Sequence, residues 1–567
     1  MTTELDGTGV TPLSGVGTAL WYEPDADLPE PPASETVDAD EERAAFEQAR
    51  GRAHEELECE RERVRERVGK NEAEVFDAHA QFLQDPQITD AVEEAIDDDL
   101  PAAHAVRRAF EDPIEQFEGM QGRMAERADD LRDVRDRLLR ILAGGDRTDL
   151  ADLPEGTVLL AERLAPSDTV QLDPERVVGF ATVTGGRTSH AAIFARSLAL
   201  PAVVGVGQGL RDIPAGEEVL VDGVKGTVTV DPATEARKRA ARELDAEVRY
   251  EPAETSDGKG VEVAANLGTL AEVNAAVERG ADGVGLLRTE FLFLDRETPP
   301  DEDEQYKAYT KVLSQFPENQ VVVRTFDVGG DKPIPYLDQP AEENPFLGER
   351  GIRRSLGPDV DLFETQLRAL LRAAESEHGD GLAVMFPLVA TVEELDAALD
   401  CVETVAADLT AEGVLHEVPD LGAMVETPAA TFMAGEFADR LDFLSVGTND
   451  LTQYVMAADR ENDHVADLHD PLHPPVLRAI RRTVKAGHER NAWVGMCGEM
   501  AGDPDLTELL VGLGLDELSM SAVTIPAVKA TVSETDAGRA HALMDRALAA
   551  ESREAVRDVL SDGGDEL

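Results

Sequence analysis

Several residue types that mark particular classes of protein are scarce in this sequence. Its 567 residues include three cysteines, Cys59, Cys401 and Cys497, which are too few and too widely spaced for a disulfide framework or a zinc cluster. This usage is typical of a reducing compartment, so we expect a cytoplasmic protein. Aromatic residues make up 4% of the chain, and aliphatic side chains must therefore dominate its cores.

Long apolar runs are also lacking. The segment 381–390 is among the longest, and it falls well short of the roughly 18 residues that mark a membrane-spanning helix. Residues 1–9 have neither the basic region nor the apolar region of a secretory signal. These two absences predict a protein without membrane insertion.

Positive charge is scarce as well. The chain has 116 acidic and 53 basic residues, of which only nine are lysine, and its formal net charge is −63. Such a field repels phosphate backbones and anionic lipids, which argues against binding to nucleic acid or to a membrane surface. The acidic residues are spread along the whole chain rather than gathered in a tail. We interpret them as a halophilic surface, adapted to high salt, where screening weakens self-repulsion.

The amino-acid composition changes along the sequence, which is too long for a single hydrophobic core. Ala, Glu, Arg and Leu dominate the early part, which predicts a helical bundle, and short Val-rich segments separated by Gly and Pro follow it. A charged stretch then predicts a helix over 236–248. The predicted domains are 1–30 with 146–232 as a mixed α/β domain, 31–145 as the bundle, 233–253 as a linker helix, 254–540 as the last large domain and 541–567 as an acidic C-terminal helix or tail.

The region from about 254 to 535 alternates strand and helix patterns. Eight β/α units in one run predict a (β/α)8 TIM-type barrel, and a doubly wound sheet is the alternative. The candidate strands are 261–266, 283–288, 321–326, 382–387, 421–426, 442–446, 492–497 and 516–520.

Reactive and ionisable side chains fall at the ends of five of these strands. In a parallel barrel the C-terminal strand ends form one rim, where active sites are built. We therefore expect these side chains to converge. They are Arg288 at the end of strand two, Arg324 in strand three, Glu426 at the end of strand five, Asn449 and Asp450 after strand six, and Cys497 at the end of strand seven.

The residue types at this rim suggest an anionic substrate. The two strand-end arginines, with Arg350 and Arg460 in nearby loops, are forked donors that match phosphate and carboxylate oxygens, although any one of them could be a surface ion pair. Glu426 and Asp450 are hard oxygen ligands suited to Mg²⁺, or else they neutralise an arginine. For Cys497, the spacing leaves open whether the thiol packs or handles a proton.

His190 is the second focus. It follows a Gly-Gly turn at 185–186 and begins an apolar, small-residue stretch, so it should lie in the first turn of a helix. Free amides there can receive a phosphate, and a neutral imidazole can act as a nucleophile. The alternative is a histidine that merely satisfies a helix start.

Eight motifs in one order carry a resemblance that spans about residues 10 to 540. The sequence resembles enzyme I of the phosphoenolpyruvate-dependent sugar phosphotransferase system, the phosphoenolpyruvate–protein phosphotransferase family. The motifs are GGRTSH at 185–190, ARSLALPA at 195–202, GLLRTEFL at 285–292, RTFDVGGDK at 324–332, NPFLG at 344–348, VETPAA at 425–430, SVGTNDLTQY at 445–454 and MCGE at 496–499.

This resemblance implies a fold and a reaction. The fold is a swivelling phosphohistidine α/β domain with an inserted α-helical bundle, followed by a C-terminal (β/α)8 barrel through which the family forms homodimers. The bundle would dock the phosphocarrier protein HPr, although it is the least similar region. The implied roles are His190 as phosphoryl carrier, Thr169 as its hydrogen-bonding partner, Arg288, Arg324, Arg350, Asn449, Asp450 and Arg460 as phosphoenolpyruvate ligands, Glu426 and Asp450 as Mg²⁺ ligands, and Cys497 as the proton donor to the enolate.

Two other readings compete with this one. Phosphoenolpyruvate synthases and pyruvate, phosphate dikinases share a swivelling histidine domain and a similar barrel, but they also need a large nucleotide-binding domain. Only about 145 residues precede the histidine domain here, and they contain no Gly-x-x-x-x-Gly-Lys-[Ser/Thr] loop. A non-catalytic regulator is the other alternative, and the intact set of rim residues argues against it.

Overall fold

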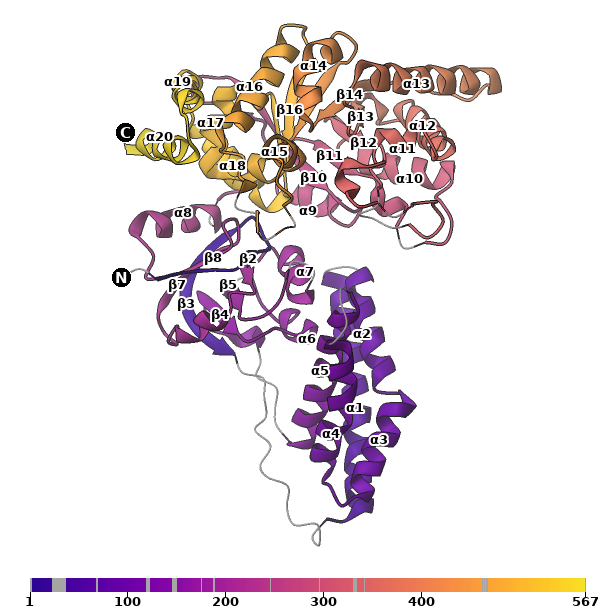
Figure 1. The fold of residues 1–567 in the computed structure, drawn as a ribbon, viewed down its shortest axis with the longest axis vertical. Coiled ribbons are helices and arrows are strands. Elements are labelled where there is room, and N and C mark those ends of the chain that lie inside the picture. The colour runs from indigo at the N-terminus through magenta and orange to yellow at the C-terminus, as the bar shows by residue number, and fades with distance from the viewer. Residues whose placement is uncertain are drawn as a thin grey trace. The chain divides into compact units, whose positions relative to one another are not determined.

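The computed structural model has two compact units, Met1–Asp245 and Ala246–Leu567, which we describe separately. Figure 1 traces the elements of both units. The structure describes residues 3–22, 37–67, 70–118, 123–144, 150–174, 176–186, 189–244, 246–294, 296–329, 334–340, 342–460, 462, 464–465 and 468–565.

The first unit contains a mixed eight-stranded sheet in the order β1-β8-β7-β3-β4-β5-β6-β2. Its centre is the parallel run β3-β4-β5-β6, and the flanking strands pair antiparallel. The strands are β1 (Thr3–Asp6), β2 (Thr8–Gly9), β3 (Ser14–Tyr22), β4 (Thr157–Ala161), β5 (Val177–Thr182), β6 (Ala202–Val204), β7 (Glu218–Asp222) and β8 (Thr227–Val230).

Both faces of this sheet are covered, which explains why its central strands are continuous apolar runs. In β4, Leu159 and Ala161 join the core on one face while Val158 and Leu160 join the core on the other. The short helices α6 (Pro166–Thr169) and α7 (His190–Ser197) lie in this part of the chain, and alanines of α7 enter the first of these cores. The covering of the sheet therefore fixes the backbone that carries His190.

Five helices inserted between β3 and β4 form the bundle that the composition predicted (Figure 1). In α1, apolar side chains recur every three or four residues, at Phe46, Ala49, Ala53 and Leu57, and all are buried. Phe194 of α7 joins the same core, so the bundle packs against the α/β domain. The helices are α1 (Ala39–Arg67), α2 (Lys70–Phe82), α3 (Pro86–Asp97), α4 (Ala102–Glu118) and α5 (Arg123–Leu142).

The linker helix is shorter than predicted. The prediction over 236–248 is wrong at its end, because α8 spans Thr234–Leu244 and residues 246–250 are not helical. The Lys529 ammonium donates to the carbonyl oxygens of Arg249 and Glu251 at 3.2 and 3.0 Å. These carbonyls, which lie within the second unit, accept from a distant side chain rather than from the amides of a continuing helix. The predicted domain boundaries themselves stay predictions.

The second unit is a closed barrel of eight parallel strands, which confirms the predicted (β/α)8 fold and excludes the doubly wound sheet (Figure 1). All eight predicted strands are present. They are β10 (Gly260–Leu267), β11 (Val284–Arg288), β12 (Val321–Arg324), β13 (Leu382–Phe386), β14 (Asp420–Val425), β15 (Phe443–Gly447), β16 (Trp493–Cys497) and β17 (Glu517–Met520), and β9 (Ala253–Glu254) pairs antiparallel with β10.

Helices surround this barrel and bury its outer face. Capping boxes begin α10 at Asp301 and α13 at Thr391, and Gly413 ends α13 in the left-handed region with φ of 73°. The longer helices are α9 (Val273–Glu278), α10 (Glu302–Leu313), α12 (Val360–Ala374), α13 (Val392–Glu412), α14 (Pro428–Ala438), α15 (Thr448–Met456), α16 (Pro474–His488), α17 (Thr507–Leu513), α18 (Ile525–Glu534), α19 (Ala537–Ala549) and α20 (Arg553–Asp565), and α11 (Ile352–Ser355) is a single turn.

The C-terminal segment is helical, and several of its apolar side chains pack into the core of the barrel unit. Met544 and Ala547 of α19 and Val556 of α20 are fully buried in the core of the barrel unit. Throughout the described residues, the helices are too short or too polar to traverse a lipid bilayer.

Candidate active site

The barrel brings the predicted rim residues to one end. Arg288 and Arg324 are the last residues of β11 and β12, and Cys497 is the last residue of β16. Glu426 directly follows β14, and Asp450 lies with Asn449 in the first turn of α15, directly after β15. Because all eight strands are parallel, these positions share the C-terminal rim.

Buried carboxylates hold the central arginine of this rim. Arg324 donates from Nη2 to Glu290 Oε1 at 2.5 Å, and its Nη1 lies 3.4 Å from Asp327 Oδ2. Burial acts to lower the pKa of Arg324, but the charges of Glu290, Asp327 and Glu426 outweigh it and raise that pKa above its ordinary value. Arg324 is thus a permanent cation with a fixed direction.

A second arginine shares one of these carboxylates. Arg350 donates from Nη2 to Asp327 Oδ2 at 2.9 Å, and the Asp327 amide in turn donates to Glu290 Oε1 at 3.1 Å. Glu290 and Asp327 lie in two of the quoted motifs, yet sequence reasoning assigned them no role. Their position two or three residues after strand-end arginines was the available signal.

A buried glutamine network fixes the loops that follow β11 and β12. The Phe326 amide donates to Gln366 Oε1 at 2.9 Å, and Gln366 Nε2 donates to Thr289 Oγ1 at 3.1 Å. Thr289 Oγ1 donates to the Arg324 carbonyl at 2.9 Å. These bonds tie the loops to α12, so the arginine geometry is built before any ligand arrives.

Glu426 lies in an excess of negative charge. It is 1% exposed, and the Leu388 amide donates to its Oε1 at 2.6 Å. Burial, followed by the charges of Asp450 and Asp327, raises the pKa of Glu426 to about 8, against the opposing effect of nearby arginines. Asp450 Oδ1 lies 3.5 Å from Arg460 Nη1 and accepts no hydrogen bond from any described residue.

These carboxylates fit a cation such as Mg²⁺. No described group of three or more His, Cys, Asp or Glu side chains forms a ready metal cage. Mg²⁺ needs no such cage, since it commonly takes one or two carboxylates and fills its other positions with water and substrate phosphate. A cation bound beside Glu426 would favour its ionised form, against the burial and the neighbouring carboxylates that raise its pKa.

Cys497 carries a protonated thiol. The side chain is buried, and desolvation raises the pKa of Cys497 to about 11, with the charges of Arg324 and Arg288 acting to lower it. At neutral pH such a group is an acid rather than a thiolate nucleophile. The next residue, Gly498, has φ of 130°, and a β-carbon there would collide with Thr448 Oγ1.

Two further arginines of the rim, Arg350 and Arg460, lie near one aromatic ring. The guanidinium groups of Arg350 and Arg460 lie 5.5 and 5.8 Å from the centre of the Phe346 ring. The Tyr454 hydroxyl donates to the Phe346 carbonyl. Asn449 is fixed through its backbone, since its carbonyl oxygen lies 2.8 Å from His469 Nε2.

Arg288 differs from the other arginines because its side chain is exposed. Among the described residues it makes no hydrogen bond or ion pair, although its charge acts on the Cys497 thiol. An anionic ligand at the rim could therefore recruit it without breaking an existing contact.

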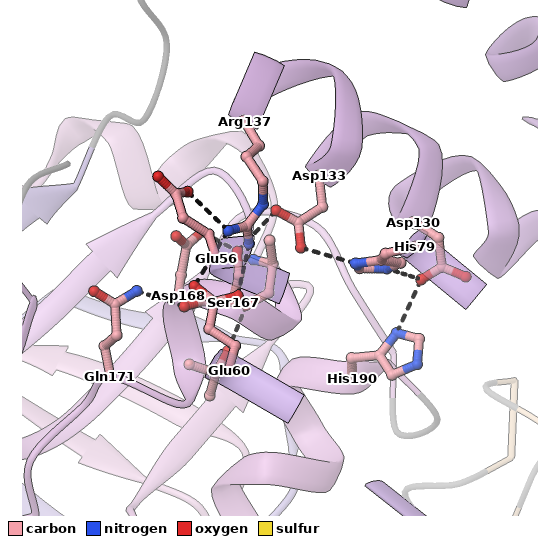
Figure 2. A network of polar contacts seen from close by, with 12 residues as sticks. Glu56, Glu60, His79, Asp130, Asp133, Arg137, Ser167, Asp168, Gln171 and His190 are labelled. Atoms are coloured by element: carbon pink, nitrogen blue, oxygen red, sulfur yellow. Dashed lines mark hydrogen bonds and ion pairs between the residues drawn. The ribbon is translucent and has the colours of Figure 1, made fainter. Parts of the chain in front are cut away.

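His190 occupies a separate site in the first unit. It is the first residue of α7, which Ser189 caps by accepting a hydrogen bond from the Ala192 amide at 3.4 Å. Its side chain is 27% exposed, and its Nδ1 lies 3.7 Å from Asp130 Oδ1 of α5 (Figure 2). Asp130 was not found from the sequence, because it lies 60 residues away in an acidic helix without a motif.

Thr169 lies in α6 and is fully buried. Its hydroxyl donates to the Ala165 carbonyl at 3.0 Å, and its described contacts do not include His190. The expected bond between Thr169 and His190 therefore stays a prediction.

Known protein families match the chain in three regions. The N-terminal region of PEP-utilising enzymes matches residues 6–127, their mobile domain matches 153–226, and their PEP-binding domain matches 242–537, about half of the chain. A phosphoenolpyruvate-protein phosphotransferase from Haloferax volcanii is 66% identical over 98% of this chain and 99% of its own length. Its Bacillus subtilis counterpart is 41% identical over 98% of both chains.

The chain belongs to the phosphoenolpyruvate–protein phosphotransferase family. It is therefore a transferase, and this excludes the alternative hypothesis of a non-catalytic regulator. In this phosphotransferase the mobile-domain match contains His190, and the PEP-binding match contains all the rim residues described above. The two sites thus fall in the two regions that the family separates.

Proposed function

We propose that this phosphotransferase moves the phosphoryl group of phosphoenolpyruvate to His190 and then to the phosphocarrier protein HPr, with release of pyruvate. The observation that carries the proposal is the rim itself, where a fixed cation, a pair of acidic side chains and a protonated thiol converge on one barrel end. This set matches a substrate that carries a phosphate, a carboxylate and a carbon that must gain a proton.

In the first half-reaction, the lone pair of an imidazole nitrogen attacks phosphorus, and the bond from phosphorus to the enol oxygen breaks. The electron pair of that bond stays on the enolate, and the Cys497 thiol then protonates its methylene carbon to give pyruvate. The Cys497 thiolate regains a proton from solvent. The arginines balance the substrate's charge throughout, and the proposed phosphoenolpyruvate ligands are Arg288, Arg324, Arg350, Asn449, Asp450 and Arg460.

Mg²⁺ is the proposed cofactor, and Glu426 and Asp450 are its proposed protein ligands. Bound there, the ion supplies positive charge to the phosphate oxygens. The proposal is supported by the hard oxygen donors of the two side chains and by the neighbouring charges of Asp450 and Asp327, which add to the effect of burial in raising the pKa of Glu426.

His190 would react through Nε2. Its Nδ1 lies on the side of Asp130, which leaves Nε2 as the nitrogen with a free lone pair. We further propose that the linker region 233–253 lets the His190 domain visit the barrel rim and then the carrier.

The proposed partners and location follow from the family resemblance. HPr would dock on the helical bundle, and it should present basic residues to this acidic chain or rely on apolar contact at high salt. We propose a cytoplasmic homodimer formed through the barrel.

Incubation with ³²P-labelled phosphoenolpyruvate, Mg²⁺ and high salt, without ATP, tests the reaction. We expect an acid-labile, base-stable label together with pyruvate. His190→Ala should abolish the label while leaving phosphoenolpyruvate binding intact, and His541→Ala, which changes an exposed histidine of α19, should leave the label unchanged. A label that survives in His190→Ala would contradict the proposal.

A further inference from the structure

A chain of alternating carboxylates and imidazoles leads from His190 into the helical bundle (Figure 2). Asp130 Oδ1 lies 3.7 Å from His190 Nδ1 and 3.2 Å from His79 Nε2. On its other side, His79 Nδ1 lies 3.4 Å from Asp133 Oδ2. Ser167 Oγ closes the chain by donating to Asp133 Oδ1 at 2.7 Å.

Four helices supply this chain. His79 comes from α2, Asp130 and Asp133 come from α5, Ser167 from α6 and His190 from α7. This row of polar side chains therefore crosses from the inserted bundle to the α/β domain. The apolar core that joins Phe194 to the bundle lies at the same junction and holds the two parts in register.

The inner members of the chain are almost completely buried. His79 is 0% exposed, and Asp130 and Asp133 are each 7% exposed. Burying carboxylates is costly unless a donor faces them. One ring nitrogen of His79, Nε2, lies within hydrogen-bond distance of Asp130, and the other, Nδ1, faces Asp133 at the longer distance of an ion pair.

The contacts of Asp130 set it apart from a packing carboxylate. Among the described residues, its hydrogen-bond and ion-pair partners are two histidines, His79 and His190, and both meet the same oxygen. Neighbouring carboxylates of α5 have different partners, since Asp129 and Asp136 each form an ion pair with an arginine. The geometry of Asp130 thus serves the orientation of His190.

We propose that Asp130, held by His79, is a positioning residue that fixes the proton of His190 on Nδ1. This proposal rests on the proposed role of His190 as the phosphoryl acceptor. It makes the inserted bundle part of the phosphohistidine site, in addition to its proposed role as a carrier-docking surface.

The proton and charge balance of the transfer agree with this role. The neutral His190 ring keeps its proton on Nδ1, facing Asp130, and the Nε2 lone pair forms the bond to phosphorus. The bond from phosphorus to the enol oxygen breaks, and its electron pair leaves with the enolate. The phosphorylated ring gains positive charge, which the Asp130 carboxylate stabilises, and no proton needs to move during the step.

The effect of Asp130 on the reaction can be measured by rapid quench of the full-length protein with ³²P-labelled phosphoenolpyruvate. Asp130→Asn should slow the labelling of His190 by about 10- to 100-fold, because an amide oxygen neither holds the Nδ1 proton nor balances the ring charge as well. Asp130→Glu should recover part of the rate. Asp129→Asn is the matched control, since it removes the same charge one residue away from a half-exposed ion pair and should label at the wild-type rate.

The tautomer of His190 gives a readout that a purely structural role would not move. Nitrogen-15 NMR of histidine-labelled wild-type protein, with the signal assigned by its loss in His190→Ala, should show a proton on Nδ1. In Asp130→Asn the population should shift toward the Nε2-protonated ring.

The outcomes separate this proposal from the one on which it rests. A wild-type protein that takes no label would overturn the proposed function, and the role of Asp130 with it. A labelled wild type with an equally fast Asp130→Asn variant, or a wild-type His190 protonated on Nε2, would overturn the role of Asp130 alone. A slow Asp130→Asn variant with a shifted tautomer supports it.

Discussion

Cys497 keeps its proton at neutral pH because the rim gives its thiolate too little compensation. Desolvation raises the pKa of Cys497 to about 11, although Arg324 and Arg288 lie near enough to lower it. The same burial raises the pKa of Glu426 to about 8. At the scale of single residues, one buried environment thus raises the pKa of both a thiol and a carboxyl group.

Removing the thiol should separate proton transfer from phosphoryl acceptance. Cys497→Ala should slow pyruvate formation by about 10²- to 10⁴-fold, the usual contribution of a positioned acid. The His190 acceptor should remain intact, which rephosphorylation from phosphorylated HPr would show. Cys401→Ala, at a half-buried position in α13, is the control. Wild-type rates of pyruvate release in Cys497→Ala would contradict the role of Cys497 as proton donor and would show that its side chain serves only in packing.

The Arg324–Glu290 pair should matter for stability as well as for binding. Glu290→Gln leaves a buried guanidinium short of one charge partner, so we expect the free energy of unfolding to fall by about 3 kcal/mol. Phosphoenolpyruvate binding should weaken, because Arg324 loses its fixed direction. Denaturant unfolding and calorimetric titration measure the two effects, and Glu297→Gln, at an exposed position in the same region, is the control. Unchanged stability would show that Asp327 alone holds Arg324.

At the scale of elements, the first and last barrel strands carry a second acidic pair. Glu262 of β10 and Glu517 of β17 are register partners, and Glu517 is 2% exposed with neither carboxylate oxygen hydrogen-bonded to a described residue. Burial, then Asp282, raises the pKa of Glu262 to about 7, and burial, then Glu262, raises the pKa of Glu517 well above its ordinary value. The strands therefore close around two carboxyl groups whose uncharged forms are favoured by burial.

This pair predicts the sign of a pH effect. A carboxyl whose pKa is raised by folding binds its proton more tightly in the folded state, so its contribution to stability falls as the pH rises above the ordinary value of 4.5 through the raised pKa, which is about 7 for Glu262 and well above the ordinary value for Glu517. Glu517→Gln should therefore raise the free energy of unfolding by about 1–3 kcal/mol at about pH 8 and by less at about pH 5. Denaturant unfolding at both pH values measures this, with exposed Glu534→Gln as the control. A loss of stability at about pH 8 would contradict the account.

The barrel elements could be predicted because most strands are short apolar runs, such as β12 and β13, bounded by polar or turn residues. The rim followed from the same pattern, since a reactive residue that ends a buried parallel strand has one rim to occupy. The polar chain through Asp130 and His79 could not be predicted, because it depends on how α2 and α5 pack against α7. The end of α8 was missed for a similar reason, since Lys529 comes from a distant part of the sequence.

At the scale of the whole molecule, the net charge of −63 sets the conditions under which the chain is stable. Ion pairs relieve only part of it, because acidic residues outnumber basic ones by more than two to one. The remaining self-repulsion acts across the surface and is screened over about 10 Å at 0.1 M salt and about 3 Å at 1 M.

Salt should therefore stabilise this protein. We expect its thermal midpoint to rise steadily as KCl increases from about 0.1 M to about 2 M, because screening shortens the range of repulsion. An uncharged osmolyte at matched osmolarity separates screening from exclusion of solute. A midpoint that is unchanged or lower in concentrated KCl would contradict the interpretation of a surface adapted to high salt.

Phosphorus-31 NMR of the wild-type protein, mixed with phosphoenolpyruvate and Mg²⁺ in high salt without ATP, tests the central claim most directly. The account predicts a new phosphohistidine resonance, with phosphorus on Nε2 of His190, and one pyruvate released for each phosphoryl group bound. A folded protein that leaves phosphoenolpyruvate unchanged, or that carries the phosphoryl group on another residue, would contradict it.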